Sequence, residues 1–258
     1  MKTRLMSVAS LFYPNNCEDI KRWIKKWETS PAPLSHKGTK ALIVPHAGYV
    51  YSGETAFKAY KSVDNEVSQV VVVGPSHKVS FKGASIGQYE TLQTPCSPLI
   101  CDKALIEALS EKFDWLTFLP NAHEEHSTEV QFPLIDHFFP KATVVEIVYS
   151  DVSALTLSAL LEECSKLPKT LLVISTDLSH FHPLERAKTL DSFCLKAIRN
   201  LNTKDLEYCE ACGITGIAAL INLASKKGWE TKNLEYTTSY EHSKDSSSVV
   251  GYASAVLV

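Results

Sequence analysis

The sequence has almost no net charge and no long apolar run, and each absence excludes a class of protein. Its 258 residues carry 26 Lys and Arg against 29 Asp and Glu, for a formal net charge of -3. No run of Lys and Arg resembles a surface that follows a phosphate backbone. No segment reaches the length of a membrane span. We therefore expect neither a nucleic-acid patch nor a membrane anchor.

A secretory signal is also missing from the start of the chain. Lys2 and Arg4 precede a short apolar stretch, but Ser7 and Ser10 interrupt it, and no small-residue cleavage site follows. The sequence therefore predicts a cytoplasmic protein.

The cysteines do not form a paired framework. The chain has seven cysteines, an odd number, and a protein of this size does not need disulfide bonds to be stable, so reduced thiols are expected. Cys209 and Cys212 form a lone Cys-x-x-Cys motif. A structural zinc site would need a second such pair, and a thioredoxin-like motif would lie earlier in the chain, so we interpret both as ordinary thiols.

Strand-like and helix-like segments alternate along the whole chain without a linker or a change in composition. The mass is 28.6 kDa and 45% of the residues are hydrophobic, enough to build a full core. The pattern predicts one α/β domain over residues 1–258, with a mostly parallel or mixed sheet flanked by helices on both faces. Strands are expected at 41–44, 70–73, 83–87, 142–148, 171–175, 233–240 and 249–257. Helices are expected at 54–62, 102–112, 153–166, 185–199 and 214–226, with another opening at 125–131.

Three of the predicted buried strands are followed at once by a histidine. His46 follows Ala-Leu-Ile-Val-Pro, His77 follows Val-Val-Val-Val-Gly-Pro-Ser, and His180 closes the segment that leaves 170–175. Ligands of open α/β sheets bind beyond the carboxyl ends of the strands, so these histidines should converge. Neutral imidazole is a common ligand of copper, iron and zinc. The pattern predicts a metal site first and general base chemistry second.

Further polar residues lie near these strand ends. His126 and Glu129 are three residues apart on a predicted helix, a spacing that suits metal ligation or a supporting role. Thr128 and Gln131 have the spacing of a capping box at the start of that helix. Asp177 is placed to orient His180 or a loop amide. The remaining histidines are interpreted as surface or helix residues: His36, His123, His137 and His182.

Six segments together resemble the Memo family. The match runs in order from Val8 to the end of the chain, and the long His-Ala-Gly-Tyr block and Gly-Pro-Ser-His are its most specific parts. The segments are 8–14, 45–53, 74–77, 125–129, 175–180 and 249–253.

The resemblance implies a fold shared with class III extradiol dioxygenases, in which two histidines and a carboxylate hold a non-haem iron. Animal Memo proteins look as if they use two histidines and a cysteine instead, with copper and redox chemistry. Bacterial members occur together with a radical-SAM protein and an AMMECR-type protein, so the resemblance implies these two proteins as partners.

The family's first two metal ligands fall on His46 and His77. An ungapped count places the third on His242, with Glu241 beside it at the position of a dioxygenase carboxylate. Successive strand residues point to opposite faces, so only one of the two can reach the metal if the strand persists there, and the register favours His242.

The family's base-like histidine falls on His180, and we assign Asp177, His126 and Glu129 to the catalytic group with it. Substrate-binding roles fall to four further positions in the matching segments, namely Tyr49, Ser76, Cys212 and Gly213.

Two functions follow from these residues. Three histidines do not neutralise a divalent ion, which leaves more Lewis acidity than an oxygenase site and resembles hydrolytic zinc. The leading hypothesis is a redox or hydrolytic enzyme with one transition metal (copper, iron or zinc) acting on a small-molecule or peptide ligand. The alternative is a non-catalytic module that binds a metal or a phosphopeptide for a partner protein.

Overall fold

The apolar runs of the sequence form the parallel centre of a mixed β-sheet. In a computed structural model that describes residues 2–31 and 33–258, the central strands lie in the order β8 (Thr143–Tyr149), β3 (Gln69–Pro75), β9 (Thr170–Ser175) and β2 (Ala41–Val44). These four strands are parallel, and all their residues except Thr143 are buried. A strand covered on both faces has no polar side, which explains the continuous apolar runs.

The C-terminal part of the chain closes one side of this sheet. β12 (Val249–Leu257) runs antiparallel to β2, and β11 (Thr231–Thr238) runs antiparallel to β12. The short strand β10 (His180–His182) pairs with the start of β12. The predicted antiparallel pair at the end of the chain is confirmed.

Short strands extend the other side of the sheet. β6 (Leu99–Cys101) pairs with β8, and beyond it lie β5 (Thr91–Leu92) and β1 (Thr3–Arg4). β4 (Ala84–Ile86) also pairs with β8, as the prediction for 83–87 requires, and β7 (Leu116–Thr117) pairs with β4. Strands of two or three residues carry too little periodicity to be recognised, which is why the others were not predicted.

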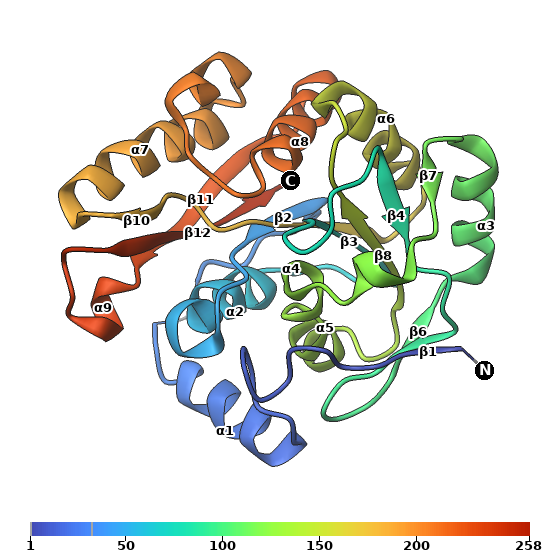
Figure 1. Ribbon diagram of the computed structural model, residues 1–258, viewed down its shortest axis with the longest axis horizontal. Helices are drawn as coiled ribbons and strands as arrows, with labels where there is room; N and C mark the ends of the chain where they lie inside the picture. The colour runs from blue at the N-terminus through green and yellow to red at the C-terminus, as the bar shows by residue number, and fades with distance from the viewer. Residues whose placement is uncertain (1, 32) are drawn as a thin grey trace.

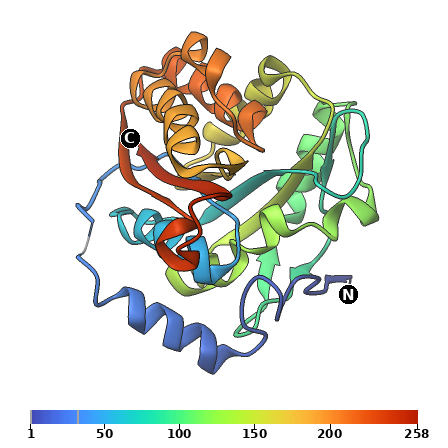
Figure 2. The ribbon, with the colours of Figure 1, turned by 60° about the vertical axis from the view of Figure 1, so that its left-hand side comes forward.

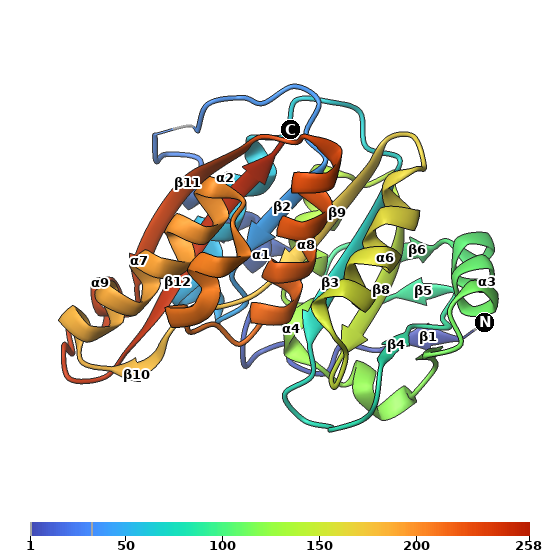
Figure 3. The same cartoon turned by 90° about the horizontal axis from the view of Figure 1, so that it is seen from above.

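Helices cover both faces of the sheet (Figures 1 and 3). One face carries α6 (Ala154–Ser165), α7 (Leu184–Asn200) and α8 (Ile214–Lys227), while α2 (Glu54–Lys61) and α5 (Phe132–Phe138) lie on the other. Figure 2 shows α1 (Cys17–Trp27) on the outside of this second layer, and α3 (Lys103–Lys112) flanks the short strands. The predicted α/β fold with a mixed sheet between two helical layers is confirmed, and its restriction to one domain stays a prediction.

The remaining helical elements are short and lie in the connections. They are η1 (Tyr49–Gly53), η2 (Pro120–His123), α4 (His126–Glu129), η3 (Thr203–Tyr208) and α9 (Tyr240–Ser243). Among residues 2–31 and 33–258, no helix combines the length and the apolar character needed to cross a bilayer.

The cysteines differ from the prediction. Cys17 is bonded to Cys96 and Cys194 to Cys209, while the other three keep free thiols. The partners are 79 and 15 residues apart in the sequence, and folding alone brings their Cα atoms to 4.6 and 4.7 Å. The expectation of reduced thiols is therefore wrong for four of the seven cysteines. The two cysteines of the Cys-x-x-Cys motif do not act together, because Cys209 forms a disulfide with Cys194 and Cys212 keeps a free thiol.

Candidate metal centre

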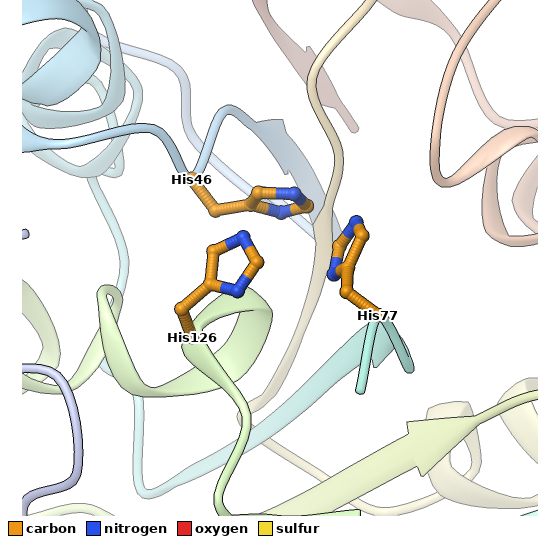
Figure 4. Close-up of side chains that lie close together, drawn as sticks. All are labelled: His46, His77 and His126. Atoms are coloured by element: carbon orange, nitrogen blue, oxygen red, sulfur yellow. The ribbon is translucent and has the colours of Figure 1, made fainter. Parts of the chain in front are cut away.

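Three histidine rings converge at the carboxyl edge of the parallel strands (Figure 4). His46 follows β2, His77 follows β3, and His126 is the first residue of α4. One possible ligand atom from each residue lies within 4.8 Å of those from the other two. The ring centroids are 5.2 Å apart for His46 and His77, 5.2 Å for His46 and His126, and 4.5 Å for His77 and His126. Such a group of nitrogen donors can hold a transition metal.

His46 is fixed in place by the end of strand β9. Its backbone N–H donates to Asp177 Oδ1 at 2.7 Å, and its Nδ1 lies 3.1 Å from Ser175 Oγ. Burial lowers the pKa of His46 well below its ordinary value, and positive charge on His126 or His77 would lower that pKa further. The ring is therefore neutral near pH 7, which is the form that binds metals. Asp177 was expected to orient His180 or a loop amide, and the structure shows the second, the backbone amide of His46.

Glu125 orients the other two histidines. Its Oε1 lies 3.2 Å from His77 Nδ1 and 2.7 Å from His126 Nδ1, which leaves Nε2 of each ring for a metal. Its Oε2 accepts the backbone N–H of His77 at 2.6 Å. A carboxylate behind a ligating histidine fixes the ring tautomer and orientation and makes the imidazole a better donor.

The Glu125 carboxylate is charged although it is buried. Burial acts to raise the pKa of Glu125, but hydrogen bonds from His126 and His77 outweigh burial and hold that pKa far below its ordinary value. Glu125 was not among the site residues predicted from the sequence. An acidic residue directly before a histidine at a helix start was the available signal, because the N-cap position lets the carboxylate fold back onto the first turn.

The N-terminal segment supplies one wall of the site. The Phe12 ring stacks on His126 with centroids 4.6 Å apart, and the Phe12 carbonyl accepts the Tyr49 N–H at 2.7 Å. The start of the chain therefore contacts both the histidine cluster and the turn after His46.

Cys212 lies beside the cluster, on the loop between η3 and α8. Its Sγ is 3.3 Å from His46 Nε2 and accepts the Asp177 N–H at 3.2 Å. Burial, followed by the negative charge of Asp177, raises the pKa of Cys212 to about 12. Gly213 allows this approach, because a Cβ there would lie 2.5 Å from Thr176 Cβ. The thiol is thus protonated and faces His46.

The prediction that His242 completes the metal site is not supported by the structure, and neither is the alternative Glu241. Strand β11 ends at Thr238, and both residues lie on the helical turn α9, where they are exposed. The His242 ring instead contacts Tyr51 at 6.2 Å between centroids. The choice between the two residues assumed that the strand persists to residue 242, but it ends at Thr238. The third histidine of the cluster is His126.

Two predicted substrate-binding residues have structural contacts instead. Tyr49 is 2% exposed, and its hydroxyl donates to the Val130 carbonyl at 3.1 Å. The Ser76 hydroxyl donates to the Val79 carbonyl at 2.7 Å and shapes the turn that carries His77. Both hydroxyl groups therefore donate to backbone carbonyls within the protein.

The helix predicted to open at 125–131 is interrupted after one turn, and its cap differs from the prediction. The Glu125 side chain caps α4, and a new helix begins at Phe132. The Thr128 hydroxyl donates to Glu146 and the Gln131 amide to the Pro45 carbonyl, so the two do not form a capping box. Tertiary partners outcompete the local cap because both side chains are buried.

Glu129 and His123 also differ from expectation. Both Glu129 carboxylate oxygens accept hydrogen bonds from the N-terminal segment, so its predicted catalytic role has no support in these contacts. His123, expected at the surface, is 2% exposed and lies between Ser85 and Glu146. His36 is buried as well.

His180 lies on β10 at the same edge of the sheet. Its backbone N–H donates to Glu210 Oε1 at 3.2 Å, and its side chain is half-buried. A positive charge on His180 lowers the pKa of both His46 and Asp177, which places it within electrostatic reach of the cluster.

The fold and site define an α/β protein with a candidate three-histidine metal centre. A family model described as Memo-like protein matches residues 4–256, and the chain belongs to the Memo family. It is 32% identical to the MEMO1 family protein MJ0403 of Methanocaldococcus jannaschii and 31% identical to a MEMO1 family protein of Aquifex aeolicus. These alignments cover 99% of both chains in the first case and 100% in the second.

One solved structure also aligns over the chain. It is an uncharacterised protein, JW3007 of Escherichia coli K12, with 15% identity, a TM-score of 0.45, and coverage of 98% of this chain and 99% of that one.

Proposed function

We propose that the protein is a metal-dependent enzyme that holds one transition metal on His46, His77 and His126. The convergence of one donor atom from each ring within 4.8 Å is the observation that carries this proposal. The neutral state of His46 and the Glu125 carboxylate behind the other two rings support it. Three nitrogen donors suit zinc, copper or iron.

The donor set favours hydrolytic chemistry over ring cleavage. The clustered donors are all imidazoles, and the carboxylate behind two of them, Glu125, is occupied by Nδ1 of both rings. When bound, the metal would supply a Lewis acid that lowers the pKa of a coordinated water. The facial triad of extradiol-type iron oxygenases instead includes a carboxylate among its ligands.

The chain's own residues supply proton transfer and orientation. His180 is the proposed general acid or base, because it is half-buried and within electrostatic reach of His46. Asp177 holds the His46 backbone, and Cys212 forms the wall next to that ring. Loss of His180 should therefore reduce turnover and leave metal affinity nearly unchanged.

Metal analysis of protein purified without a His tag tests the proposal. We expect about one equivalent of a transition metal per chain, and a double variant with His46→Ala and His77→Ala should retain none while keeping its circular dichroism spectrum. Stoichiometric metal in the folded double variant would falsify the site.

A comparison of cells tests whether the protein is an enzyme. Strains carrying wild type, His180→Ala or a deletion are compared by untargeted analysis of metabolites and modified macromolecules. The enzyme proposal requires the His180→Ala strain to resemble the deletion. If it resembles wild type while the deletion differs, the protein acts through binding. Association with a radical-SAM protein and an AMMECR-type protein, and a cytoplasmic location, stay predictions.

A further inference from the structure

The helical turn that carries His126 is too short to hold its own shape. α4 spans His126–Glu129, a single turn, and isolated helices of that length are not stable. Yet Glu125 at its start and His126 on its first turn set the geometry of two of the three rings. Contacts from outside the helix must therefore fix its position.

A buried arginine from the N-terminus provides one set of contacts. Arg4 is 3% exposed, and its guanidinium donates to the Glu129 carboxylate and, at 3.1 Å, to the Glu125 carbonyl. Its Nε also lies 3.2 Å from Glu146 Oε1, an ion pair. One side chain thus reaches both ends of α4 and the sheet below it.

Glu129 ties the same turn to the N-terminal segment. Its carboxylate accepts the Ser7 N–H and hydroxyl at 2.9 and 2.6 Å, the Val8 N–H at 2.9 Å and the Tyr13 hydroxyl at 2.7 Å. This segment also places Phe12 against the His126 ring. Helix, segment and ring are therefore held as one unit.

Glu146 links α4 to the centre of the sheet. It lies in the middle of β8, 1% exposed, and accepts the Thr128 hydroxyl at 2.6 Å. Its other oxygen is 2.8 Å from His123 Nδ1, and His123 Nε2 is 2.8 Å from Ser85 Oγ. We call Arg4, His123, Glu129 and Glu146 the anchor network.

Stability alone does not account for such a network. Desolvation of buried charges offsets most of the attraction between them, so an apolar cluster of the same size is often at least as stable. What charged groups add is directional, charge-assisted hydrogen bonding with a defined geometry. Here these directional hydrogen bonds hold α4, the helical turn that carries the proposed metal ligand His126.

We propose that Arg4 and Glu129 are positioning residues of the metal centre, which hold α4 so that His126 and Glu125 face the other two histidines. This inference rests on the proposed metal site and assigns the N-terminal segment a part in it. Neither residue contacts the metal position, so both act through α4.

The test compares Glu129→Gln with a control on the opposite edge of the sheet. Asp102→Asn is the control, because Asp102 is a partly buried carboxylate that caps α3 and accepts from the Gln69 amide at 2.6 Å, yet lies at the amino ends of β3 and β8. Metal affinity is measured by competition titration with zinc, and site geometry by the absorption spectrum of the cobalt-substituted protein. Arg4→Lys and Tyr13→Phe are milder variants should Glu129→Gln not fold.

We expect Glu129→Gln to lower zinc affinity by at least about tenfold, because this is the usual effect of removing a residue that supports a metal ligand. The variant should also change the cobalt spectrum. Arg4→Lys should act in the same direction and Tyr13→Phe less strongly. The Asp102→Asn variant should be less stable than wild type but keep the wild-type zinc affinity and cobalt spectrum. Wild-type affinity and spectrum in folded Glu129→Gln would overturn the inference.

Hydrogen exchange without metal separates this inference from the proposed function. In the metal-free protein, amides of residues 126–130 should exchange faster in Glu129→Gln than in wild type, and those of α3 should not. If wild type binds no metal, the proposed function fails. Faster exchange would then still support the anchoring of α4, and unchanged exchange would overturn it.

Discussion

At the residue scale, the site depends on how each histidine is held. His46 is oriented from β9, whereas His77 and His126 share the Glu125 carboxylate. Of the three histidines that the strand-end pattern predicted to converge, His46 and His77 belong to one cluster, whereas His180 is not in that group. The pattern could not identify Glu125, because a carboxylate that supports two rings is recognised only when the rings are already placed.

Replacing Glu125 by glutamine should weaken metal binding. The neutral amide oxygen is a weaker acceptor than a carboxylate oxygen for the two Nδ1–H groups. The glutamine NH2 group would also face the His77 backbone N–H that Glu125 Oε2 accepts, so the side chain could no longer hold both rings in place. We expect a loss of metal affinity of about 10- to 100-fold, measured by competition titration. Glu124→Gln is the control, because Glu124 is the exposed neighbour. Equal affinities in the two variants would contradict the assigned role of Glu125.

At the scale of elements, the loop between η3 and α8 connects a disulfide to the site. Cys209 anchors it to α7 through Cys194, Glu210 accepts from the His180 N–H, and Cys212 contacts His46. The sequence predicted the flanking helices 185–199 and 214–226 well. It did not predict the disulfide, because the pairing depends on the packing of α7 against η3.

Counting thiols tests this pairing. Unreduced, denatured protein should react with three equivalents of a thiol reagent, since Cys101, Cys164 and Cys212 are free, and with seven after reduction. Alanine at both Cys194 and Cys209 should lower the free energy of unfolding by about 3 kcal/mol, the chain-entropy estimate for a loop of this length. Seven reactive thiols before reduction would contradict the assignment.

At the scale of the whole molecule, the sheet could be predicted and its connections could not. Long apolar runs and cap residues fix strands and helices locally, so the helices expected at 102–112 and 153–166 were assigned correctly, and their N-caps are Asp102 and Ser153. The third member of the cluster was not assigned correctly, because His242 was placed by an ungapped count against the family resemblance, whereas the strand it was expected to follow ends at Thr238. Where a strand stops is decided by tertiary packing, which a periodic pattern does not contain.

The buried carboxylates of the anchor network predict sensitivity to acid. Burial acts to raise the pKa of Glu129 and Glu146, but Arg4 and hydrogen bonds lower both below the ordinary 4.5. The unfolded chain therefore binds more protons below about pH 4.5, so this stabilisation is present above that pH and lost as the pH falls. In urea titrations, the stability difference between wild type and Glu129→Gln should shrink below pH 4.5. A difference independent of pH would be inconsistent with a charged Glu129.

The central claim is that His126, and not His242, completes a metal site with His46 and His77. It is tested most directly by zinc titration of two single variants of the untagged protein. His242→Ala should bind about one equivalent with wild-type affinity, because His242 lies exposed on α9. His126→Ala should lose at least about tenfold in affinity. Loss of zinc in His242→Ala with wild-type binding in His126→Ala would contradict the account.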